Sequence, residues 1–331
     1  MQFTTSVGLP TGRLEISHQN CIMLVGSCFA SNIGAKLSGV KFHIDTNPFG
    51  VQYNPLSIAT VLSRVADGTL FDASSPELFE HGDKWHSILH HSDFSRSGKD
   101  ELIDSINSRL VAAHKSFMEC DTLIVTFGTA YAYIRNSDNA VVGNCHKLPG
   151  NMFTRRLLGV DEIVSCMGAL LNRYFQERPS LRVIFTVSPI RHLRDGAHDN
   201  QKSKATLLLS IDKLENMFPQ NVSYFPAYEI MLDELRDYRF YADDMLHPSA
   251  VAVGYIWECF GKSYFTCSTQ KMNTTIEDIM RAVSHRPFDA TSIAHKKFLE
   301  NLLVRIKEIT AQYPYLDFQK EIAQCSTQLN K

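Results

Sequence analysis

Three short, largely apolar runs recur along the chain, at residues 21–26 (CIMLVG), 122–128 (TLIVTFG) and 182–189 (RVIFTVSP). A strand that is buried on both faces of a parallel sheet is apolar at almost every position, whereas a strand with one wet face alternates. Each run is bounded by Gly, Ser or Pro, residues that commonly flank strands. The pattern therefore predicts three buried strands of a parallel sheet.

Stretches with the helical spacing of apolar residues follow these runs. The predicted helices cover approximately residues 30–38, 55–66, 100–117, 160–177 and 199–217. Strand followed by helix, repeated along the chain, is typical of an open parallel sheet that carries helices on both faces. We expect a three-layer α/β/α domain.

Residues 77–94 depart from this alternation of strand and helix. Their side chains alternate between apolar and polar, which predicts a β-hairpin inserted at the rim of the domain. This segment also contains His86, His90 and His91 close to Asp93. Their spacing suits metal ligands on a helix, whereas the alternation predicts a strand, so we predict no metal site.

The spacing of apolar residues changes again near the carboxyl end of the sequence. Beyond residue 267 the apolar spacing is helical, and Thr275 and Asp278 are placed as in a capping box. We predict one domain over residues 1–267 and a helical extension over residues 268–331 that packs on it.

Composition and charge narrow the class of protein. Hydrophobic residues make up 44% and charged residues 21% of the 331 residues, as in folded globular proteins. The net charge is −2, and no run of basic residues is interleaved with aromatics, which argues against nucleic acid as a partner. The amino terminus lacks a basic segment followed by an apolar one, and no apolar run reaches about 18 residues. We expect a cytoplasmic protein without a membrane partner.

The eight cysteines are scattered, and none forms a pair at the two-residue gap of metal and redox motifs. Reduced thiols are therefore expected. The chain also lacks the glycine-rich phosphate loops of nucleotide-binding proteins. We predict that the protein uses no cofactor.

Two adjacent nucleophile-type residues, Ser27 and Cys28, follow the first predicted strand directly after Gly26. In an open parallel sheet, ligands gather at the carboxyl ends of the strands. A helix that begins here places free N–H groups beside both side chains, and these groups stabilise a thiolate or an oxyanion. The alternative is an ordinary strand-to-helix turn, with Ser27 as the N-cap and Cys28 as a small buried residue.

A second stretch, YADDMLHPSAV, contains a carboxylate and an imidazole three residues apart, Asp244 and His247, just before a predicted helix. A histidine that acts as a base needs a carboxylate on one ring nitrogen to fix its tautomer. This one segment supplies both groups. By itself the spacing is a weak signal, because an aspartate before a helix is often only a cap.

A nucleophile after the first strand and an Asp-x-x-His-Pro before a late helix occur in this order in SGNH (GDSL-like) hydrolases. The chain resembles that superfamily, and its GSCFA stretch identifies it as a member of the GSCFA family within it. The resemblance spans about residues 20–312 and includes NPFGVQYNP (47–55), TFGTAYAY (126–133), NCHKLP (144–149) and TVSPIRH (186–192).

The resemblance implies a flavodoxin-like α/β/α fold, a shallow site at the strand ends, and hydrolysis or transfer of acyl groups. It implies His247 as general base and Asp244 as its orienting partner. The nucleophile of the superfamily lies two residues after the glycine of a Gly-Asp-Ser motif, which is Cys28 in this chain, while Ser27 takes the place of the aspartate. We predict Cys28 as the nucleophile and keep Ser27 as the alternative.

The resemblance also implies an oxyanion hole. One donor is the backbone N–H of the nucleophile, and a second is a glycine of the second motif, for which Gly50 is the match. The third is an asparagine, but TFGTAYAY offers only Gly128 and Thr129 at that place. Either the backbone there donates, or Asn144 reaches in from the following loop, or the hydrolytic apparatus is weakened.

Four further side chains are candidates for binding a carboxylate or phosphate of the substrate, with a charged rim as the alternative. They are His146, Lys147, Arg191 and His192.

Together these features predict an esterase that removes a small O-acyl group, expected to be acetyl, from a saccharide-like substrate through an acyl-enzyme. One alternative is an acyltransferase that uses a thioester donor and a cysteine nucleophile. Another is a ligand-binding protein that keeps the fold without turnover, which the missing asparagine and the altered Gly-Asp-Ser motif favour. The sequence does not predict an oligomeric state.

Overall fold

The computed structural model describes residues 5–12 and 14–329. At its centre lies a sheet of five parallel strands, ordered β10-β9-β5-β1-β2. Their bounds are β1 (Cys21–Gly26), β2 (His43–Thr46), β5 (Thr122–Phe127), β9 (Arg182–Val187) and β10 (Val222–Phe225). Numbered along the chain, this is the 2-1-3-4-5 order of flavodoxin-like sheets, so the predicted fold class is confirmed. The order reverses between β1 and β5, and such a point is where ligands bind.

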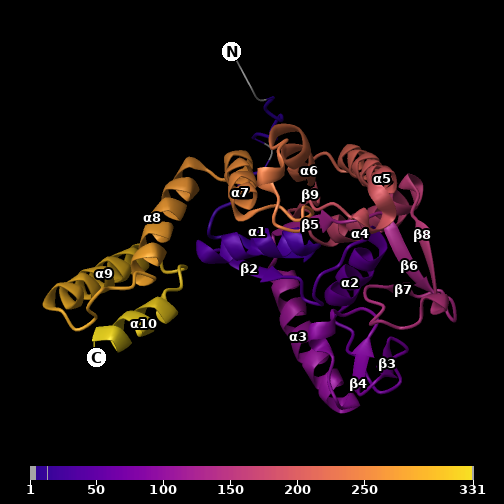
Figure 1. The fold of residues 1–331 in the computed structure, drawn as a ribbon, viewed down its shortest axis with the longest axis horizontal. Helices are drawn as coiled ribbons and strands as arrows, with labels where there is room; N and C mark the ends of the chain where they lie inside the picture. Colours follow the sequence, from indigo (N-terminus) through magenta and orange to yellow (C-terminus); the bar gives the residue numbers. More distant parts are fainter. Residues whose placement is uncertain (1–4, 13, 330–331) are drawn as a thin grey trace.

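Helices cover both faces of this sheet (Figure 1). On one face lie α2 (Pro55–Asp67), α3 (Lys99–Glu119), α4 (Val160–Glu177) and α5 (Gly196–Met217), and on the other α1 (Cys28–Gly39) and α7 (Ala250–Tyr264). Strand β1 supplies side chains to both cores: Met23 and Val25 join the first, and Ile22 and Leu24 join the second. Because side chains alternate between the faces of a strand, a continuous apolar run serves both.

Two small antiparallel sheets are inserted between these elements. The predicted hairpin is confirmed as β3 (Leu78–His81) and β4 (Lys84–Ser87). A second sheet, which the sequence analysis did not predict, is ordered β7-β6-β8. Its strands are β6 (Tyr131–Arg135), β7 (Val141–Val142) and β8 (Phe153–Leu157). The shorter helical segments are η1 (Ser92–Phe94), η2 (Gly150–Met152), η3 (Leu193–Asp195), α6 (Ala227–Glu229), η4 (Ile230–Glu234) and η5 (Tyr238–Phe240).

The carboxyl-terminal part is helical, as predicted, and lies beyond α1 and α7 at the left of Figure 1. It consists of α8 (Cys267–Val283), α9 (Ile293–Gln312) and α10 (Gln319–Leu329). Lys41, next to α1, forms an ion pair with Glu321 at 2.7 Å and lies 5.1 Å from the ring centre of the buried Phe318. These helices therefore share a core with the α1 face. Among the described residues, no helix is long and apolar enough to cross a membrane.

The predicted capping box at Thr275 and Asp278 is wrong. Helix α8 already begins at Cys267, where the Thr266 side chain accepts the N–H of Thr269 at 3.0 Å. Thr275 is inside the helix, and its hydroxyl donates to the Lys271 carbonyl at 3.1 Å. The Thr-x-x-Asp spacing has capping geometry only at a helix start, and here the amphipathic pattern continues upstream of it.

Gly26 ends β1 in a conformation and a space that exclude a side chain. Its φ is +148°, and a Cβ built on it would lie 2.2 Å from the carbonyl oxygen of Thr126 on the neighbouring β5. That oxygen belongs to the sheet backbone and cannot move aside cheaply. Glycine is therefore required directly before Ser27 and Cys28.

Gly26→Ala is expected to lower the free energy of unfolding by about 3–5 kcal/mol, because backbone strain and a backbone clash add together. Gly39→Ala is the matched control, since nothing lies within 4 Å of a Cβ at that position. It should change stability by less than about 1 kcal/mol. Urea denaturation of the two variants measures the difference, and equal midpoints would contradict the close approach of β1 and β5.

Candidate active site

The loops that follow β1, β5 and β9 surround a cleft of about 740 Å³. Ser27 and Cys28 border it from the first loop, Thr129 from the second and His192 from the third. His247, distant in sequence, borders the same cleft. The structure thus brings the predicted nucleophiles and the predicted base to one site at the switch point of the sheet.

Ser27 and Cys28 have different environments. Ser27 is 1% exposed and caps α1: its hydroxyl oxygen accepts the Phe29 N–H at 3.3 Å. Cys28 is the first residue of α1 and is partly buried, with its Sγ 3.6 Å from the hydroxyl of Tyr53. The Cys28 backbone N–H has no acceptor among the described residues. The Ser27 hydroxyl is therefore used to cap α1. Cys28 places both a thiol and an N–H without an acceptor at the start of that helix.

The NPFGVQYNP motif holds this turn in place. The Asn47 side-chain oxygen accepts the Gly26 N–H at 2.8 Å, and its amide nitrogen donates to the Ser31 hydroxyl at 2.8 Å. The Gln52 N–H donates to the Gly26 carbonyl at 2.9 Å. The motif therefore binds both the N–H and the carbonyl of Gly26, the residue directly before Ser27 and Cys28.

Tyr53, in the same motif, connects the nucleophile with the loop after β5. Its carbonyl accepts the N–H groups of Gly128 at 2.8 Å and Thr129 at 2.9 Å. Burial, and then the hydrogen bond with Cys28, raise the pKa of the Tyr53 hydroxyl well above its usual range. The hydroxyl therefore stays protonated, and it is placed to donate to a sulfur anion.

Asp244 and His247 lie in a short loop that folds back on itself. The loop is closed by the Ala242 N–H, which donates to the His247 carbonyl at 2.8 Å. One carboxylate oxygen of Asp244 accepts the N–H groups of Leu246 and His247, each at 2.9 Å, and the other accepts from His247 Nδ1 at 2.5 Å. The two backbone hydrogen bonds are the main cause that lowers the pKa of Asp244 to about 2. Because an ionised carboxylate only accepts, Nδ1 carries a proton and Nε2 is left to act as a base.

Among the described residues, His247 is hydrogen-bonded only to this loop, so no direct hydrogen bond joins it to Cys28 or Ser27. His247, Cys28 and Ser27 nevertheless border the same cleft. In sites without substrate, catalytic hydrogen bonds are commonly long or incomplete.

Arg191 holds the Asp244–His247 loop against the end of β9. Its guanidinium donates to the Met245 carbonyl and lies 4.4 Å from the ring centre of Tyr241. Its backbone N–H donates to the Leu246 carbonyl at 3.4 Å. Arg191 also borders the cleft, so its expected role in binding a substrate anion stays a prediction, beside the contacts that it makes with the loop of the candidate base.

The other three predicted binding residues are placed differently from one another. His146 is 6% exposed, does not border the cleft, and bonds through Nε2 to the Ser87 carbonyl at 2.8 Å, so its expected contact with substrate is wrong. Lys147 is exposed, borders the cleft and has no partner among the described residues. His192 also borders the cleft; its Nε2 is buried and finds no partner in the part of the chain that the structure describes, and burial lowers its pKa to about 4. It is a neutral ring near neutral pH.

The predicted oxyanion donors are largely occupied. The Gly50 N–H donates to the Asn47 carbonyl at 2.8 Å, and the N–H groups of Gly128 and Thr129 both donate to Tyr53. Neither Gly50 nor Gly128 borders the cleft. Asn144 does border it, but its amide nitrogen donates to the Ser92 hydroxyl at 3.2 Å. The backbone N–H groups of Gly50, Gly128 and Thr129 are therefore not free to donate to an oxyanion in this structure. For Asn144 the expected role stays a prediction, since only one of its two amide hydrogens is used.

The burial of Lys204 beside the loops of the cleft was not predicted. Lys204 on α5 is 1% exposed, and its ammonium donates to the carbonyls of Gly128 and Ser188, each at 2.7 Å. Burial lowers the pKa of Lys204 to about 7. It joins the loops after β5 and β9, and only the apolar neighbours along α5 hint at this burial in the sequence.

The unpredicted β6–β8 sheet forms one wall of the cleft. Tyr131, Tyr133 and Phe153 present aromatic rings there. Arg155 forms an ion pair with Asp195 at 2.6 Å, and its guanidinium lies 4.0 Å from the ring centre of Tyr131. The wall thus combines apolar ring faces with fixed polar groups, as in sites that bind small organic ligands.

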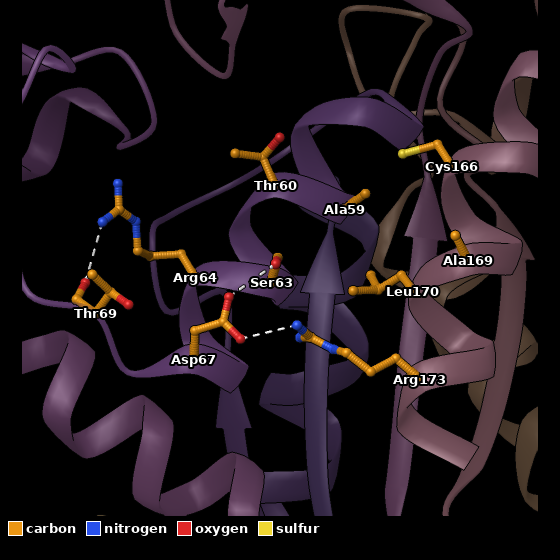
Figure 2. A pocket seen from close by; sticks show the side chains of 10 residues that line it. All are labelled: Ala59, Thr60, Ser63, Arg64, Asp67, Thr69, Cys166, Ala169, Leu170 and Arg173. Atoms are coloured by element: carbon orange, nitrogen blue, oxygen red, sulfur yellow. Dashed lines mark hydrogen bonds and ion pairs between the residues drawn. The ribbon is translucent and has the colours of Figure 1, made fainter. Parts of the chain in front are cut away.

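A second hollow lies between α2 and α4 (Figure 2). Its charged side chains are paired: Arg173 contacts Asp67 at 3.0 Å, and Arg64 contacts Glu77 at 2.5 Å. Cys166 lines it, but no histidine does. It lacks the nucleophile and base that the first cleft brings together.

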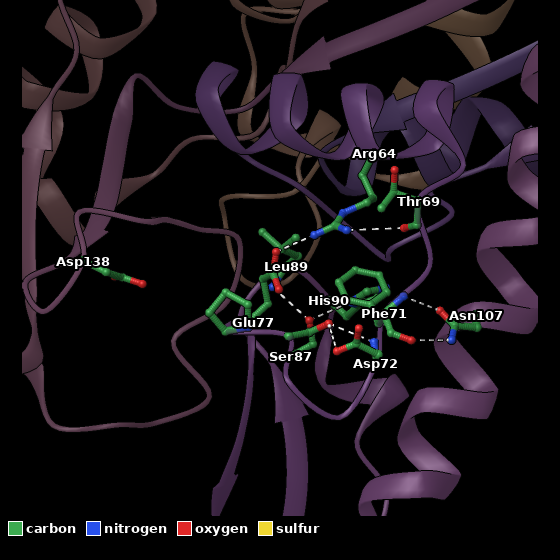
Figure 3. Close-up of polar contacts among 12 residues, drawn as sticks. Arg64, Thr69, Phe71, Asp72, Glu77, Ser87, Leu89, His90, Asn107 and Asp138 are labelled. Carbon is green, nitrogen blue, oxygen red and sulfur yellow. Dashed lines mark hydrogen bonds and ion pairs between the residues drawn. The ribbon is translucent and has the colours of Figure 1, made fainter.

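Two histidines of the hairpin region, His86 and His90, are buried packing residues, whereas His91 borders the cleft. His90 bonds through Nδ1 to the Ser87 hydroxyl at 2.8 Å, as Figure 3 shows, and stacks on Phe49 with ring centres 4.0 Å apart. His86 bonds to the Ser95 hydroxyl at 2.7 Å. Within residues 5–12 and 14–329, no group of three or more His, Cys, Asp or Glu side chains is arranged to hold a metal ion.

Comparison with known proteins gives two family matches. A model described as the GSCFA family matches residues 21–260, and one described as the GSCFA domain protein, C-terminal domain, matches residues 276–331. No curated protein matches the chain.

Two solved structures are similar at low identity. One is a carbohydrate esterase family 2 enzyme plus carbohydrate binding domain from Corynascus thermopiles (Myceliophthora fergusii), with 12% identity, a TM-score of 0.38, and coverage of 78% of this chain and 67% of that chain. The other is an acetyl xylan esterase from the rumen bacterium Butyrivibrio proteoclasticus, with 12% identity, a TM-score of 0.34, and coverage of 63% and 55%.

Proposed function

The chain belongs to the GSCFA family, and from that premise we propose that it is an ester hydrolase that works through an acyl-enzyme on Cys28. The observation that carries the proposal is one cleft bordered both by Cys28, at the start of α1, and by His247, oriented by Asp244. Nucleophile, base and orienting carboxylate are the parts that acyl transfer requires.

The proposed reaction proceeds in two halves. His247 Nε2 removes the thiol proton of Cys28, and the sulfur attacks the carbonyl carbon of the ester. The carbonyl oxygen becomes an anion beside the free Cys28 N–H, the C–O bond to the alcohol breaks, and His247 returns the proton to that alcohol. Water, deprotonated by His247, then attacks the thioester and releases the acid and the thiol.

Tyr53→Phe is expected to slow the alkylation of Cys28 by iodoacetamide at neutral pH by about tenfold. The hydroxyl 3.6 Å from Sγ is lost, and a hydrogen bond to a charged group contributes about 1.5–3 kcal/mol. Tyr133→Phe is the control, because Tyr133 borders the same cleft but, among the described residues, Cys28 Sγ is hydrogen-bonded to Tyr53 and not to Tyr133. Alkylation followed by mass spectrometry gives both rates. An unchanged rate for Tyr53→Phe would show that the Tyr53 hydroxyl does not stabilise the Cys28 thiolate.

For the substrate we propose a small O-acyl ester, an acetyl ester, on a saccharide-like alcohol. The aromatic wall of Tyr131, Tyr133 and Phe153 offers apolar faces to a ring, and the Arg155–Asp195 pair offers donors and acceptors to hydroxyl groups. Lys147, which has no ion-pair partner among the described residues, adds a cation to the cleft lining. These features support an alcohol of at least one sugar ring.

The alternative function is acyl transfer from a thioester donor to such an alcohol. The observation that favours it is the thiol nucleophile itself, since exchange of an acyl group between two sulfur atoms conserves the thioester bond. In that case the acceptor alcohol, and not water, takes the acyl group from Cys28.

The test is release of acetate from 4-nitrophenyl acetate and from acetylated xylo-oligosaccharides, followed with and without a deacetylated acceptor. Acetate release without acceptor supports the hydrolase, and acetylated acceptor formed at the expense of acetate supports the transferase. An oligosaccharide that raises the melting temperature but is never deacetylated, together with no turnover of either ester, would contradict both and indicate a binding protein.

A further inference from the structure

The Cys28 N–H, at the start of α1, has no acceptor among the described residues, and a tetrahedral intermediate is normally stabilised by at least two donors. The N–H groups of Gly50, Gly128 and Thr129 are occupied by other carbonyls. The third motif carries no asparagine at the expected place. A second donor therefore has to come from elsewhere on the cleft surface.

Asn54 borders the cleft with a side-chain NH₂ group that donates to no acceptor among the described residues. It is the N-cap of α2, and its Oδ1 accepts the Ser57 N–H at 2.9 Å. The Asn54 carbonyl accepts the Ser57 hydroxyl at 3.0 Å and the Ile58 N–H at 3.1 Å. Because a backbone N–H only donates, the amide oxygen must face the helix, and the NH₂ group is turned away from it.

The NH₂ group of Asn54 reaches the cleft. Asn54 is 5% exposed, and the cleft is the hollow that it borders. Its Nδ2 donates to no group among the described residues, yet it is not one of the fully buried polar atoms that lack a partner. The neighbouring Tyr53 hydroxyl contacts Cys28 Sγ, which places this stretch of chain beside the nucleophile.

We infer that Asn54 Nδ2, together with the Cys28 N–H, binds the carbonyl oxygen of the ester as it becomes an anion. The amide donor of the oxyanion hole comes in this chain from the end of the second motif, NPFGVQYNP, and not from the third. This inference rests on the proposed acyl chemistry at Cys28. It also gives the occupied N–H groups of Gly128 and Thr129 a role, since their bonds to the Tyr53 carbonyl fix the peptide that precedes Asn54.

The test separates the capping role of Asn54 from the donor role. Asn54→Ser and Asn54→Asp both keep an oxygen that caps α2, and both lose the amide donor. We expect kcat for 4-nitrophenyl acetate to fall about 10²–10³-fold in each, with KM changed little, as when one oxyanion donor is removed. Asn54→Asp should be the slower of the two, because its carboxylate repels the anion.

Ser57→Ala is the matched control. It removes the hydroxyl that bonds to the Asn54 carbonyl but keeps the Ser57 N–H and the amide, so kcat should stay close to that of the wild type. Melting temperatures of all variants show whether capping is preserved. A folded Asn54→Ser or Asn54→Asp variant with wild-type kcat, alongside an inactive Cys28→Ala, overturns the inference and leaves the proposed function standing. A wild type that neither turns over the ester nor becomes acylated overturns both.

Discussion

Replacement of Cys28 by alanine is expected to lower kcat/KM for an activated acetyl ester by at least about 10⁴-fold, because no covalent intermediate can form. Ser27→Ala is the matched control on the neighbouring residue. Ser27 is buried and its hydroxyl caps α1, so its loss should cost about 1 kcal/mol of stability and leave most of the turnover.

This pair of variants also decides between the two candidate nucleophiles. An inactive, folded Ser27→Ala with an active Cys28→Ala would reverse the assignment and require the turn before α1 to be wound differently. Melting temperatures recorded for both variants exclude unfolding as the cause of lost activity.

The second large effect is expected at the Asp244–His247 pair. His247→Ala should lower kcat by about 10³–10⁴-fold, because the thiol proton then has no acceptor and the leaving alcohol has no donor. Asp244→Asn should be nearly as severe. One Asp244 oxygen accepts two backbone N–H groups, so the amide nitrogen of an asparagine has to face His247 Nδ1 and forces the tautomer whose Nε2 is protonated.

Asp243→Asn is the control for this prediction. Asp243 adjoins Asp244 in the same loop and has no hydrogen-bond or ion-pair partner among the described residues. Its replacement changes the same formal charge and should leave kcat close to that of the wild type. Equal losses in the two variants would point to the charge of the loop and not to the orientation of His247.

The parts of the fold that the sequence predicted are those set by local pattern. The strands at 21–26 and 182–187 are buried on both faces, and such a strand is apolar at consecutive positions. This pattern can be recognised from the sequence alone. Asp244 and His247 were also accessible from the sequence, because the bond between them spans three residues of one loop. The position of Cys28 follows from a count of two residues after a glycine that cannot be replaced.

The parts that were missed depend on contacts between distant residues. Arg191 looks like a free cation in the sequence, but it contacts a carbonyl 54 residues away. Lys204 has the appearance of a solvated helix residue, and its acceptors are carbonyls at the ends of two strands. In both cases the hydrogen-bond acceptors are backbone carbonyls, so residue types give no signal of these hydrogen bonds.

The oxyanion donors illustrate the same limit in another way. Motif matching assigns a role to Gly50, Gly128 and Thr129, but whether an N–H is free depends on which carbonyl lies opposite it in the fold. Asn54 was overlooked because an asparagine before a proline and a helix is explained by capping alone. Only the cap geometry shows that the Asn54 oxygen is used by the helix and that its NH₂ group is left without an acceptor among the described residues.

The central claim is an acyl-enzyme on Cys28, and the most direct measurement is mass spectrometry of wild-type protein mixed with 4-nitrophenyl acetate and quenched in acid during turnover. The account predicts one acetyl group per chain, located on Cys28 by fragmentation, labile to neutral hydroxylamine as a thioester is, and lost again when the ester is exhausted. An acetyl group on Ser27, or consumption of the ester at the wild-type rate by Cys28→Ala, would contradict it.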